Sequence, residues 1–285
     1  MDENPRFSVG QCATLACLLE VSAPKPGNVH RAADFEDMTL TDFLVSATAI
    51  APAMDAAVHR GVGATVWAAV RATRQVVPVN TNLGTVLLLA PLACVPRAQT
   101  LGDGIATVLG AMGAEDSRLV YEAIRQAQPG GLGRVETMDI ADAPPADLLA
   151  AMREAAPRDL VARQYANGFA QVLRRAAPWV VECQAAGWSL AESVVRTQLH
   201  LLTEFPDSLI ARKCGAAVAS QASAKAAAVL AAGRPGEAAY HAALADFDFW
   251  LRGDGHRRNP GTTADLIAAG LFAVLRDEQV VLPWH

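Results

Sequence analysis

The sequence predicts an all-α protein: a single large multi-helix domain, residues 1–285, with a central polar pocket. Apolar segments with helical spacing are broken by short Pro or Gly stops, and the alternation typical of strands is nearly absent. At 285 residues the chain is close to the size at which one hydrophobic core stops growing, and no part of it has a distinct composition. We therefore expect one helical domain without a boundary inside it.

Ala, Leu and Val dominate the apolar segments, and the Pro and Gly stops set their limits. In chain order the predicted helices are Ser8–Val21, Thr41–His59, Gly63–Val76, Leu83–Val95, Asp103–Met112, Asp116–Gln128, Pro145–Arg153, Asp159–Ala185, Leu190–Thr203, Asp207–Ala232, Pro235–Leu251 and Thr263–Arg276. Thr39 with Asp42 and Ser189 with Glu192 match the capping box, so the second and ninth helices have defined starts. The Gly-rich segment Gln128–Pro145 is predicted to be a long mobile loop.

Composition and charge exclude several classes of protein. Hydrophobic residues make up 52% of the chain and charged residues 19%, which excludes disorder for its bulk. The net charge is only −5 and no stretch concentrates Lys and Arg, so nucleic acid is not an expected partner.

The sequence also gives expectations about location. The acidic start at Asp2 and Glu3 does not fit a secretory signal, and the five cysteines have no C-x-x-C pair, so we expect a cytoplasmic protein without disulfides or a zinc site. The uncharged stretch Gln75–Pro96 has the length of a membrane span, but its prolines and asparagines indicate a buried segment and no membrane partner.

Four short segments rich in polar residues, Gly and Pro interrupt the helices, and each lies beside a predicted helix end. Polar loops of this density in an apolar helical protein indicate a site, because buried polar groups need partners and function concentrates on connections. The segments are Pro24–Arg31 with Asp34–Asp37, Asn80–Gly84, Glu204–Asp207 with Arg212 and Lys213, and Asn259–Asp265.

The first segment places Lys25 between two prolines, which stiffen the backbone around the ammonium, and Gly27 lets a ligand approach closely. This arrangement suits a phosphate; the alternative is a tight turn with an exposed lysine. The crowded carboxylates of Asp34, Glu36 and Asp37 could hold Mg²⁺ through one or two oxygens, and the alternative is a solvated acidic loop.

The second and fourth segments each precede an apolar helix. Asn80 and Asn82 flank Thr81, so ordinary N-capping is one interpretation. A buried helix start that faces a polar pocket is also a place where an anion binds, because free amides and the helix dipole are directed at it. Asp265 stands three residues after Thr262, which matches a capping box as well as a catalytic carboxylate.

The third segment combines an acid with two bases. Asp207 after Pro206 could be a plain N-cap, and the pair Arg212 and Lys213 would bind a polyphosphate as readily as it would lie on a solvated face. His30 in the first loop could act as an acid or base, but the histidines lack metal-binding spacing. Serine hydrolase, P-loop and dinucleotide motifs are absent.

Taken in order, five segments resemble the triphosphoribosyl-dephospho-coenzyme A synthase family, over about Glu20–Leu275. They are Ala23–Val29, Phe35–Met38, Asn80–Gly84, Pro206–Lys213 and Asn259–Leu266. The resemblance implies an all-helical fold and transfer of the triphosphoribosyl group of ATP to a ribose hydroxyl of dephospho-coenzyme A, with release of adenine.

The chain departs from the better-known members of that family at three places. Those members read Asn-Thr-His-Lys-Gly where this chain has Asn80–Gly84, Gly-Ser where it has Thr262 and Thr263, and Asp where it has His30. This version is similar to a branch associated with archaea and with bacteria that use tetrahydromethanopterin. We therefore expect the fold and the ATP donor to carry over more safely than the acceptor.

On this resemblance we expect a deep pocket for ATP. Lys25, Arg212 and Lys213 would face its phosphates. The other expected nucleotide-binding residues are Asn28, Asn80, Thr81, Asn82, Gly84, Asn259 and Thr262.

Carboxylates would supply the chemistry and hold the expected cofactor, Mg²⁺. Asp37 and Asp265 are the expected catalytic residues, and Glu36, Asp37, Asp207 and Asp265 the expected metal ligands. A carboxylate must deprotonate the acceptor hydroxyl while the ribose passes through an oxocarbenium-like state, and we assign this base to Asp37.

The acceptor follows from stereochemistry. ATP is a β-N-glycoside, so a single displacement of adenine inverts C1 and gives an α-ribosyl product, the linkage present at the ribitol of tetrahydromethanopterin. The candidate acceptors are therefore dephospho-coenzyme A and a pterin-linked ribitol. Two other functions fit the same residues: a helical nucleotide-binding module without catalysis, and a Mg²⁺-dependent N-glycoside hydrolase. A homodimer is one option for the assembly.

Overall fold

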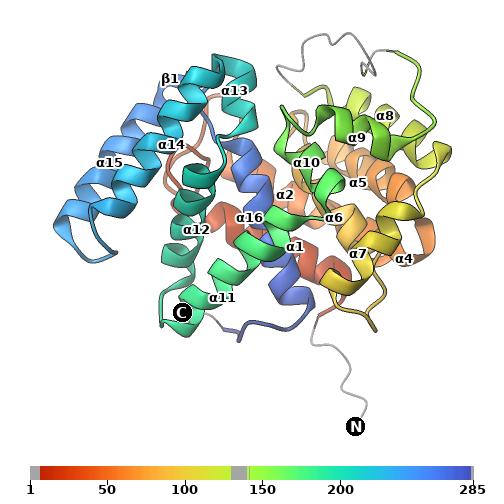
Figure 1. Cartoon of the computed structure of the whole chain (residues 1–285), viewed down its shortest axis with the longest axis horizontal. Coiled ribbons are helices and arrows are strands. Elements are labelled where there is room, and N and C mark those ends of the chain that lie inside the picture. Colours follow the sequence, from red (N-terminus) through yellow and green to blue (C-terminus); the bar gives the residue numbers. More distant parts are fainter. Residues whose placement is uncertain (1–6, 130–139, 141, 284–285) are drawn as a thin grey trace.

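The computed structural model describes residues 7–129, 140 and 142–283 and confirms the all-α class (Figure 1). The first helices are α1 (Val9–Ser22), α2 (Leu40–Ala49), α3 (Ala51–Asp55), α4 (Ala57–Arg60), α5 (Val62–Val76), α6 (Leu83–Ala93), α7 (Leu101–Gly110) and α8 (Ala114–Ala127). The later elements are α9 (Leu148–Ala155), α10 (Leu160–Asn167), the π-helix η1 (Val172–Ala176), α11 (Ala177–Ala185), α12 (Leu190–Glu204), α13 (Ser208–Cys214), α14 (Ala216–Ala231), α15 (Ala238–Arg252), the short strand β1 (Gly253–His256) and α16 (Gly261–Arg276).

Three segments that were predicted as single helices are divided into two or more helices in the structure, so these predictions are wrong. Thr41–His59 divides into α2, α3 and α4, with Pro52 in the first turn of α3. Asp159–Ala185 breaks at Gly168, which ends α10 with a φ of 67°. Asp207–Ala232 breaks at Gly215, whose φ is 92°. Proline supplies no amide donor, and glycine adopts positive φ without strain, so both residues end helices inside apolar runs.

The sequence also predicted two capped helix starts and one long loop. Both capping boxes are confirmed: the Asp42 carboxylate accepts the Thr39 amide at 2.8 Å, and Ser189 and Glu192 bond reciprocally. The predicted loop Gln128–Pro145 lies largely outside the described residues.

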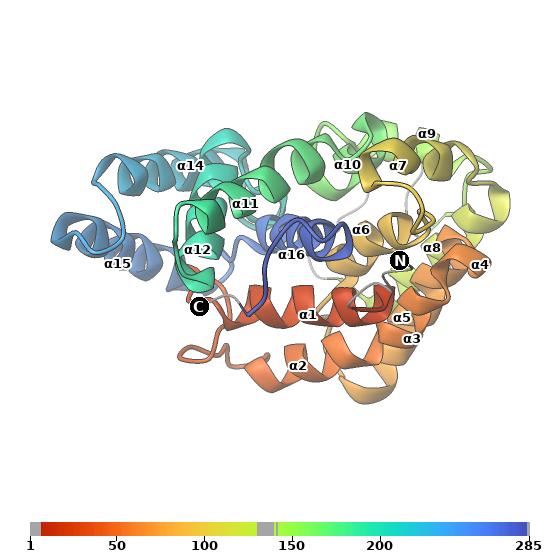
Figure 2. The ribbon, with the colours of Figure 1, turned by 90° about the horizontal axis from the view of Figure 1, so that it is seen from below.

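Helix α16 forms the centre of the larger hydrophobic core (Figure 2). It packs along α1 and contacts α6, η1 and α11, and its residues are buried along nearly the whole length. At its far end Arg276 is 4% exposed, and its guanidinium donates to the carbonyls of Val95, Pro96 and Gln99. The C-terminal end of α16 is therefore fixed to the segment that follows α6.

A proline inside α6 is compensated by a tyrosine. Pro91 lacks the amide that would bond to the carbonyl of Leu87, and the buried Tyr165 hydroxyl donates to that carbonyl at 2.6 Å. This bond ties α10 to α6 beside the cavity described below.

A second, smaller core joins α12, α13, α14 and α15. Helix α12 belongs to both cores, since Val194 and Leu201 pack in the larger one and Leu199 and Leu202 in the smaller. In Figure 1, α14 and α15 project to the left of the α1 and α16 core.

The end of α15 holds the loop that follows α1. The Gly27 amide donates to Asp248 at 2.7 Å, and the Arg252 guanidinium bonds both Asp248 and the Asn28 carbonyl. Gly27 has a φ of 74°, and a Cβ there would lie 2.8 Å from Leu251, so only glycine fits.

No helix of the described part of the chain is long and apolar enough to cross a membrane.

Candidate active site

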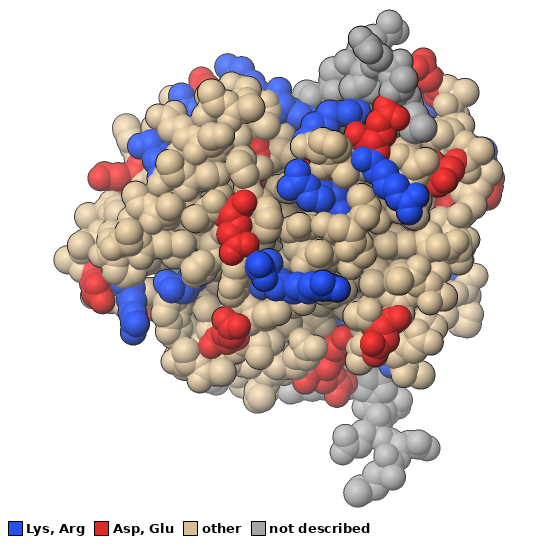
Figure 3. Space-filling model, viewed as in Figure 1, with Lys and Arg blue, Asp and Glu red and all other residues tan. Residues whose placement is uncertain are grey.

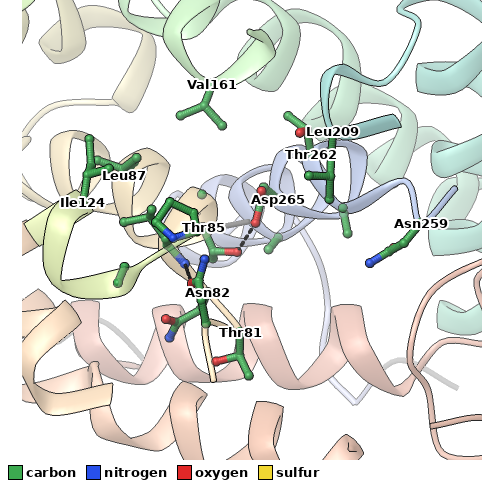
Figure 4. Close-up of a pocket in the computed structure, with 18 of the residues that line it drawn as sticks. Thr81, Asn82, Thr85, Leu87, Ile124, Val161, Leu209, Asn259, Thr262 and Asp265 are labelled. Atoms are coloured by element: carbon green, nitrogen blue, oxygen red, sulfur yellow. Dashed lines mark hydrogen bonds between the residues drawn. The ribbon is translucent and has the colours of Figure 1, made fainter. Parts of the chain in front are cut away.

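A cavity of about 760 Å³ lies between the N-terminal turn of α16, the start of α6, the end of α1 and helices α8, α9, α10 and α13. The polar side chains of Thr81, Asn82, Thr85 and Asp265 occupy the middle of the view in Figure 4, and Leu87 and Ile124 lie to one side. All four polar segments predicted from the sequence contribute lining residues that are functional candidates, and Asp37 comes from the acidic part of the first.

Asp265 is the acidic group nearest the start of α6. The Thr85 hydroxyl donates to its Oδ1 at 2.7 Å, drawn as a dashed line in Figure 4. A Cβ on Gly84 would lie 2.0 Å from its Oδ2, so the carboxyl occupies the space that Gly84 leaves. Protein atoms surround the group although it opens to the cavity. Burial, with Glu20 and Asp207 nearby, raises its pKa to about 8, so at neutral pH it holds a proton.

The capping alternative for Asp265 is wrong. Helix α16 begins at Gly261 with Pro260 at the N-cap, and the Ser208 hydroxyl donates to Thr262 at 3.1 Å. Thr262 is buried and lines the cavity.

Asp207 is a structural clasp between two helices. It is fully buried, its Oδ1 accepts the amides of Leu209 and Ile210, and its Oδ2 accepts the amide and hydroxyl of Thr263 at 2.7 Å. The N-cap alternative is confirmed. Burial raises the pKa of this carboxyl against the effect of its hydrogen bonds. Since both oxygens are already bonded and Asp207 does not line the cavity, it is not placed to be a metal ligand.

Lys25 lies behind the cavity wall. It is fully buried, so the exposed-lysine alternative is wrong. Its ammonium donates to the main-chain carbonyls of Glu20 and Ala23 and lies 3.0 Å from Glu20 Oε1. In this arrangement the ammonium does not line the cavity, whereas Glu20 does.

Asn28 and Asn259 form one polar corner. The Asn28 amide donates to Asn259 Oδ1 at 2.5 Å, and Gln198 donates to Asn28 Oδ1 at 2.8 Å. Both asparagines line the cavity, so the structure brings together the first and last predicted segments. His30 is buried outside the lining, and burial lowers its pKa.

The three polar residues before α6 make different contacts. Asn80 accepts the Leu83 amide at 3.1 Å, which confirms capping at that residue. Asn82 makes no cap bond and instead donates to Thr73 at 3.1 Å, so capping at Asn82 is wrong. Thr81 bonds the Ser46 hydroxyl at 2.6 Å. All three residues line the cavity.

The three acids of the first segment also lie in different surroundings. Asp34 accepts the Leu40 amide at 2.6 Å and supports the start of α2. Glu36 is exposed and does not line the cavity. Asp37 does line it, is largely exposed at 58%, and lies 3.6 Å from His256, which stacks on Phe35.

Cationic side chains lie in the cavity wall on α13 and beside α10. Arg212 pairs with Asp159 at 2.6 Å, and Lys213 follows it. Lys and Arg gather over the region of α10 and α13 in Figure 3. Sequence analysis missed Arg158 and Arg74, which also line the cavity, because neither lies in a polar segment.

A family model described as ATP:dephospho-CoA triphosphoribosyl transferase matches residues 6–282. The chain belongs to the ATP:dephospho-CoA triphosphoribosyl transferase family.

A solved structure agrees with this assignment. A protein from Archaeoglobus fulgidus that has been proposed to be a triphosphoribosyl-dephospho-CoA synthase is 26% identical, with a TM-score of 0.64 over 85% of this chain and 100% of that chain. No curated protein matches the chain.

Two of the positions at which the sequence analysis noted a departure from the family motif lie at the site: Asn82 and Leu83 both line the cavity. The cavity wall at the start of α6 is therefore uncharged.

The expected Mg²⁺ ligands converge only in part. Of the four, Asp37 and Asp265 line the cavity. Within the described ranges, no three His, Cys, Asp or Glu side chains are close enough to hold a metal. Asp37 fits a Mg²⁺ that takes one or two protein oxygens and the rest of its shell from phosphates and water.

Proposed function

We propose that this protein transfers a phosphorylated ribosyl group from ATP to a hydroxyl of a small-molecule acceptor and releases adenine. The observation that carries the proposal is the Asp265 carboxyl, which accepts the Thr85 hydroxyl and borders a cavity whose wall also contains cationic side chains. Burial raises the pKa of this carboxyl, which favours its protonated form. Family membership supports the same reaction type.

In this proposal the triphosphate of ATP binds beside α13. Arg212 and Lys213 offer charged donors from the end of that helix, and Arg158 lies in the same wall. The pairing of Arg212 with Asp159 fixes the direction of its guanidinium, which is otherwise a long and mobile side chain.

Mg²⁺ belongs to the proposal as a companion of the triphosphate. Asp37, which is exposed in the lining, is the protein oxygen that remains free to approach it. When bound, the ion neutralises phosphate charge.

Asp265 is assigned to proton transfer. Adenine leaves with an electron pair, and a neutral carboxyl can give that nitrogen base a proton as the bond to C1 breaks. Thr85 donates to the other oxygen and fixes the plane of the carboxyl group.

The acceptor we propose is a pterin-linked ribitol, with a role in tetrahydromethanopterin biosynthesis, in place of dephospho-coenzyme A. The support is electrostatic as well as stereochemical. An ATP and a second polyanion together need many cations, and the described lining residues include more carboxyl groups than Lys and Arg side chains. The basic ones are Arg74, Arg158, Arg212 and Lys213, and the acidic ones are Glu20, Asp37, Glu154, Asp159 and Asp265. An uncharged acceptor end suits this wall and the neighbouring apolar surface of Leu87, Ile124 and Met152.

The experiment mixes the protein with ATP, Mg²⁺ and either dephospho-coenzyme A or the ribitol-bearing pterin precursor, then measures adenine by chromatography and products by mass spectrometry. The expected result is adenine release and a pterin adduct. Triphosphoribosylated dephospho-coenzyme A without a pterin adduct overturns the acceptor. ATP binding without adenine release indicates the binding module, and adenine release without any acceptor indicates the N-glycoside hydrolase.

A further inference from the structure

Glu20 is a buried acid that opens into the cavity and that the sequence motifs do not include. It lies in the last turn of α1 and is 8% exposed. Its Oε1 is buried 3.0 Å from the Lys25 ammonium, and the residue lines the cavity. A carboxyl that is sheltered from bulk water and still borders a cavity is placed to reach a ligand there.

Lys25 stands behind this carboxyl as its counter-ion. The ammonium is fully buried and 3.0 Å from Glu20 Oε1, and two main-chain carbonyls accept its other protons. A buried ion pair contributes little to stability, because desolvation offsets the attraction between the charges. The pair is thus better explained by what it does to the cavity than by the stability of the fold.

The carboxyl of Asp265 lines the same cavity. Glu20 lies in the last turn of α1 and Asp265 in the first turns of α16, the two helices pack along each other, and Asp265 is close enough for the charge of Glu20 to act on it. Two carboxyls on one cavity can divide the work of an acid and a base when their environments differ. The two environments differ in geometry: Glu20 has the Lys25 ammonium 3.0 Å from its Oε1, which favours the charged carboxylate, whereas Asp265 accepts only the neutral Thr85 hydroxyl.

We propose that Glu20 is the general base that takes the proton of the acceptor hydroxyl, held in place by Lys25. The inference rests on the proposed function. It assigns the general base to the buried Glu20 instead of Asp37, which is exposed and contacts His256. Glu20 is missed by motif reading, but it is the only charged residue of α1, and a lone charge in an apolar helix is a usable signal.

The proton balance of the reaction closes with these two residues. The acceptor oxygen forms a bond to C1 of the ribose as its proton passes to the Glu20 carboxylate. The bond from C1 to the adenine nitrogen breaks and its electron pair stays on adenine. Asp265 gives a proton to the adenine that leaves. Glu20 takes one proton and Asp265 gives one, so after the reaction Glu20 is protonated and Asp265 is ionised. Proton exchange with solvent then restores the starting protonation state of each carboxyl.

The first test is Glu20→Gln, which preserves shape and removes the base. We expect the rate of adenine release to fall about 100-fold or more, with the Kd for ATP changed by less than about threefold. Glu20→Asp should retain an intermediate rate. The matched control is Glu122→Gln, a surface glutamate paired with Arg118, which should behave as the unaltered protein.

Chemical rescue separates a base from a structural residue. In Glu20→Ala, added formate should restore part of the rate, whereas chloride at equal ionic strength should not. If the single variants fail to fold, the pair Glu20→Gln with Lys25→Met removes both buried charges. That double variant should fold, bind ATP and release no adenine.

The outcomes distinguish the two proposals. Unaltered protein that releases adenine, together with a Glu20→Gln variant of equal rate, overturns only the role of Glu20. Unaltered protein that releases no adenine with any acceptor overturns the proposed function and the role of Glu20 with it.

Discussion

Asp207 and Asp265 show how two aspartates in similar sequence contexts acquire different roles. Each follows a proline-containing loop and stands near the start of a helix. Asp207 is bonded on both oxygens, whereas Asp265 accepts one hydroxyl and opens to the cavity. The partners that decide this, Thr263 and Thr85, lie 56 and 180 residues away along the chain. Local motifs therefore identified both positions but could not assign their roles.

Asp265→Asn should abolish turnover without loss of the fold. The folded-state pKa of about 8 is above that of the unfolded chain, so the proton on Asp265 supports folding fully below pH 4, and this support is lost as pH rises from 4 to 8. Asparagine has no proton to lose. Relative to the unaltered protein, the variant should therefore gain stability across that window, by up to about 1.4 kcal/mol per pH unit.

Urea unfolding at pH 5 and pH 8 measures this change. Asp246→Asn, an exposed aspartate on α15, is the control and should show no such trend. A variant of Asp265 that unfolds at neutral pH would instead show that the carboxyl is structural.

Asp207→Ala should weaken the fold. It removes the cap of α13 and the bonds to Thr263 together, so we expect a loss of about 3 kcal/mol in the free energy of unfolding. Asp147→Ala removes one exposed cap bond at α9 and should cost about 1 kcal/mol. Equal losses in the two variants, measured by thermal unfolding, would contradict the clasp between α13 and α16.

At the scale of the elements, the sequence located the helices well but not their breaks. Periodicity identifies a buried apolar run, and the cap motifs at Thr39 and Ser189 are local, so these features were predictable. The breaks at Gly168 and Gly215 were not, because a glycine inside an apolar run can also continue a helix. Lys25 was found as a motif, but its partner Glu20 was not, since the contact depends on how the chain turns after α1.

Gly84 and Gly102 provide a paired test of how α6 and α16 approach each other. Both are the second residue of a helix. A Cβ at Gly84 would meet Asp265 at 2.0 Å, whereas the nearest atom at Gly102 is 3.9 Å away. Gly84→Ala should displace the carboxyl and reduce adenine release about 100-fold or more.

Gly102→Ala should leave the rate unchanged and add about 0.5–1 kcal/mol to stability, because alanine favours helix. Steady-state rates and thermal unfolding of the two variants check this pair. An active Gly84→Ala protein would show that the crossing of the two helices is not tight.

At the scale of the whole molecule, the cavity is assembled from segments distributed along most of the chain, from Cys17 to Ala268. The polar segments predicted the place of the site because each lies at a helix end. The apolar wall and the cations Arg74 and Arg158 could not be predicted, since they come from helix positions that carry no motif.

Removal of divalent metal should act on ligand binding and not on the fold. Among the described residues no cluster can hold a metal alone, so EDTA should leave the thermal midpoint of the free protein unchanged. ATP with Mg²⁺ at about 100 times its Kd should add about 2.7 kcal/mol of stability, and EDTA should reduce that gain. Destabilisation of the free protein by EDTA, seen by calorimetry, would instead reveal a resident metal.

The central position of α16 has a consequence for synthesis in the cell. This helix fills the middle of the larger core and packs along α1, yet it is made about 240 residues later. At about 5–20 residues per second, α1 is made on the order of 12–50 seconds before the synthesis of α16 begins, and α6 precedes α16 by a shorter interval. During that interval the apolar faces of α1 and α6 and the Glu20 and Lys25 pair lack their final cover. The nascent chain should therefore be a client of ribosome-associated chaperones until α16 closes the core.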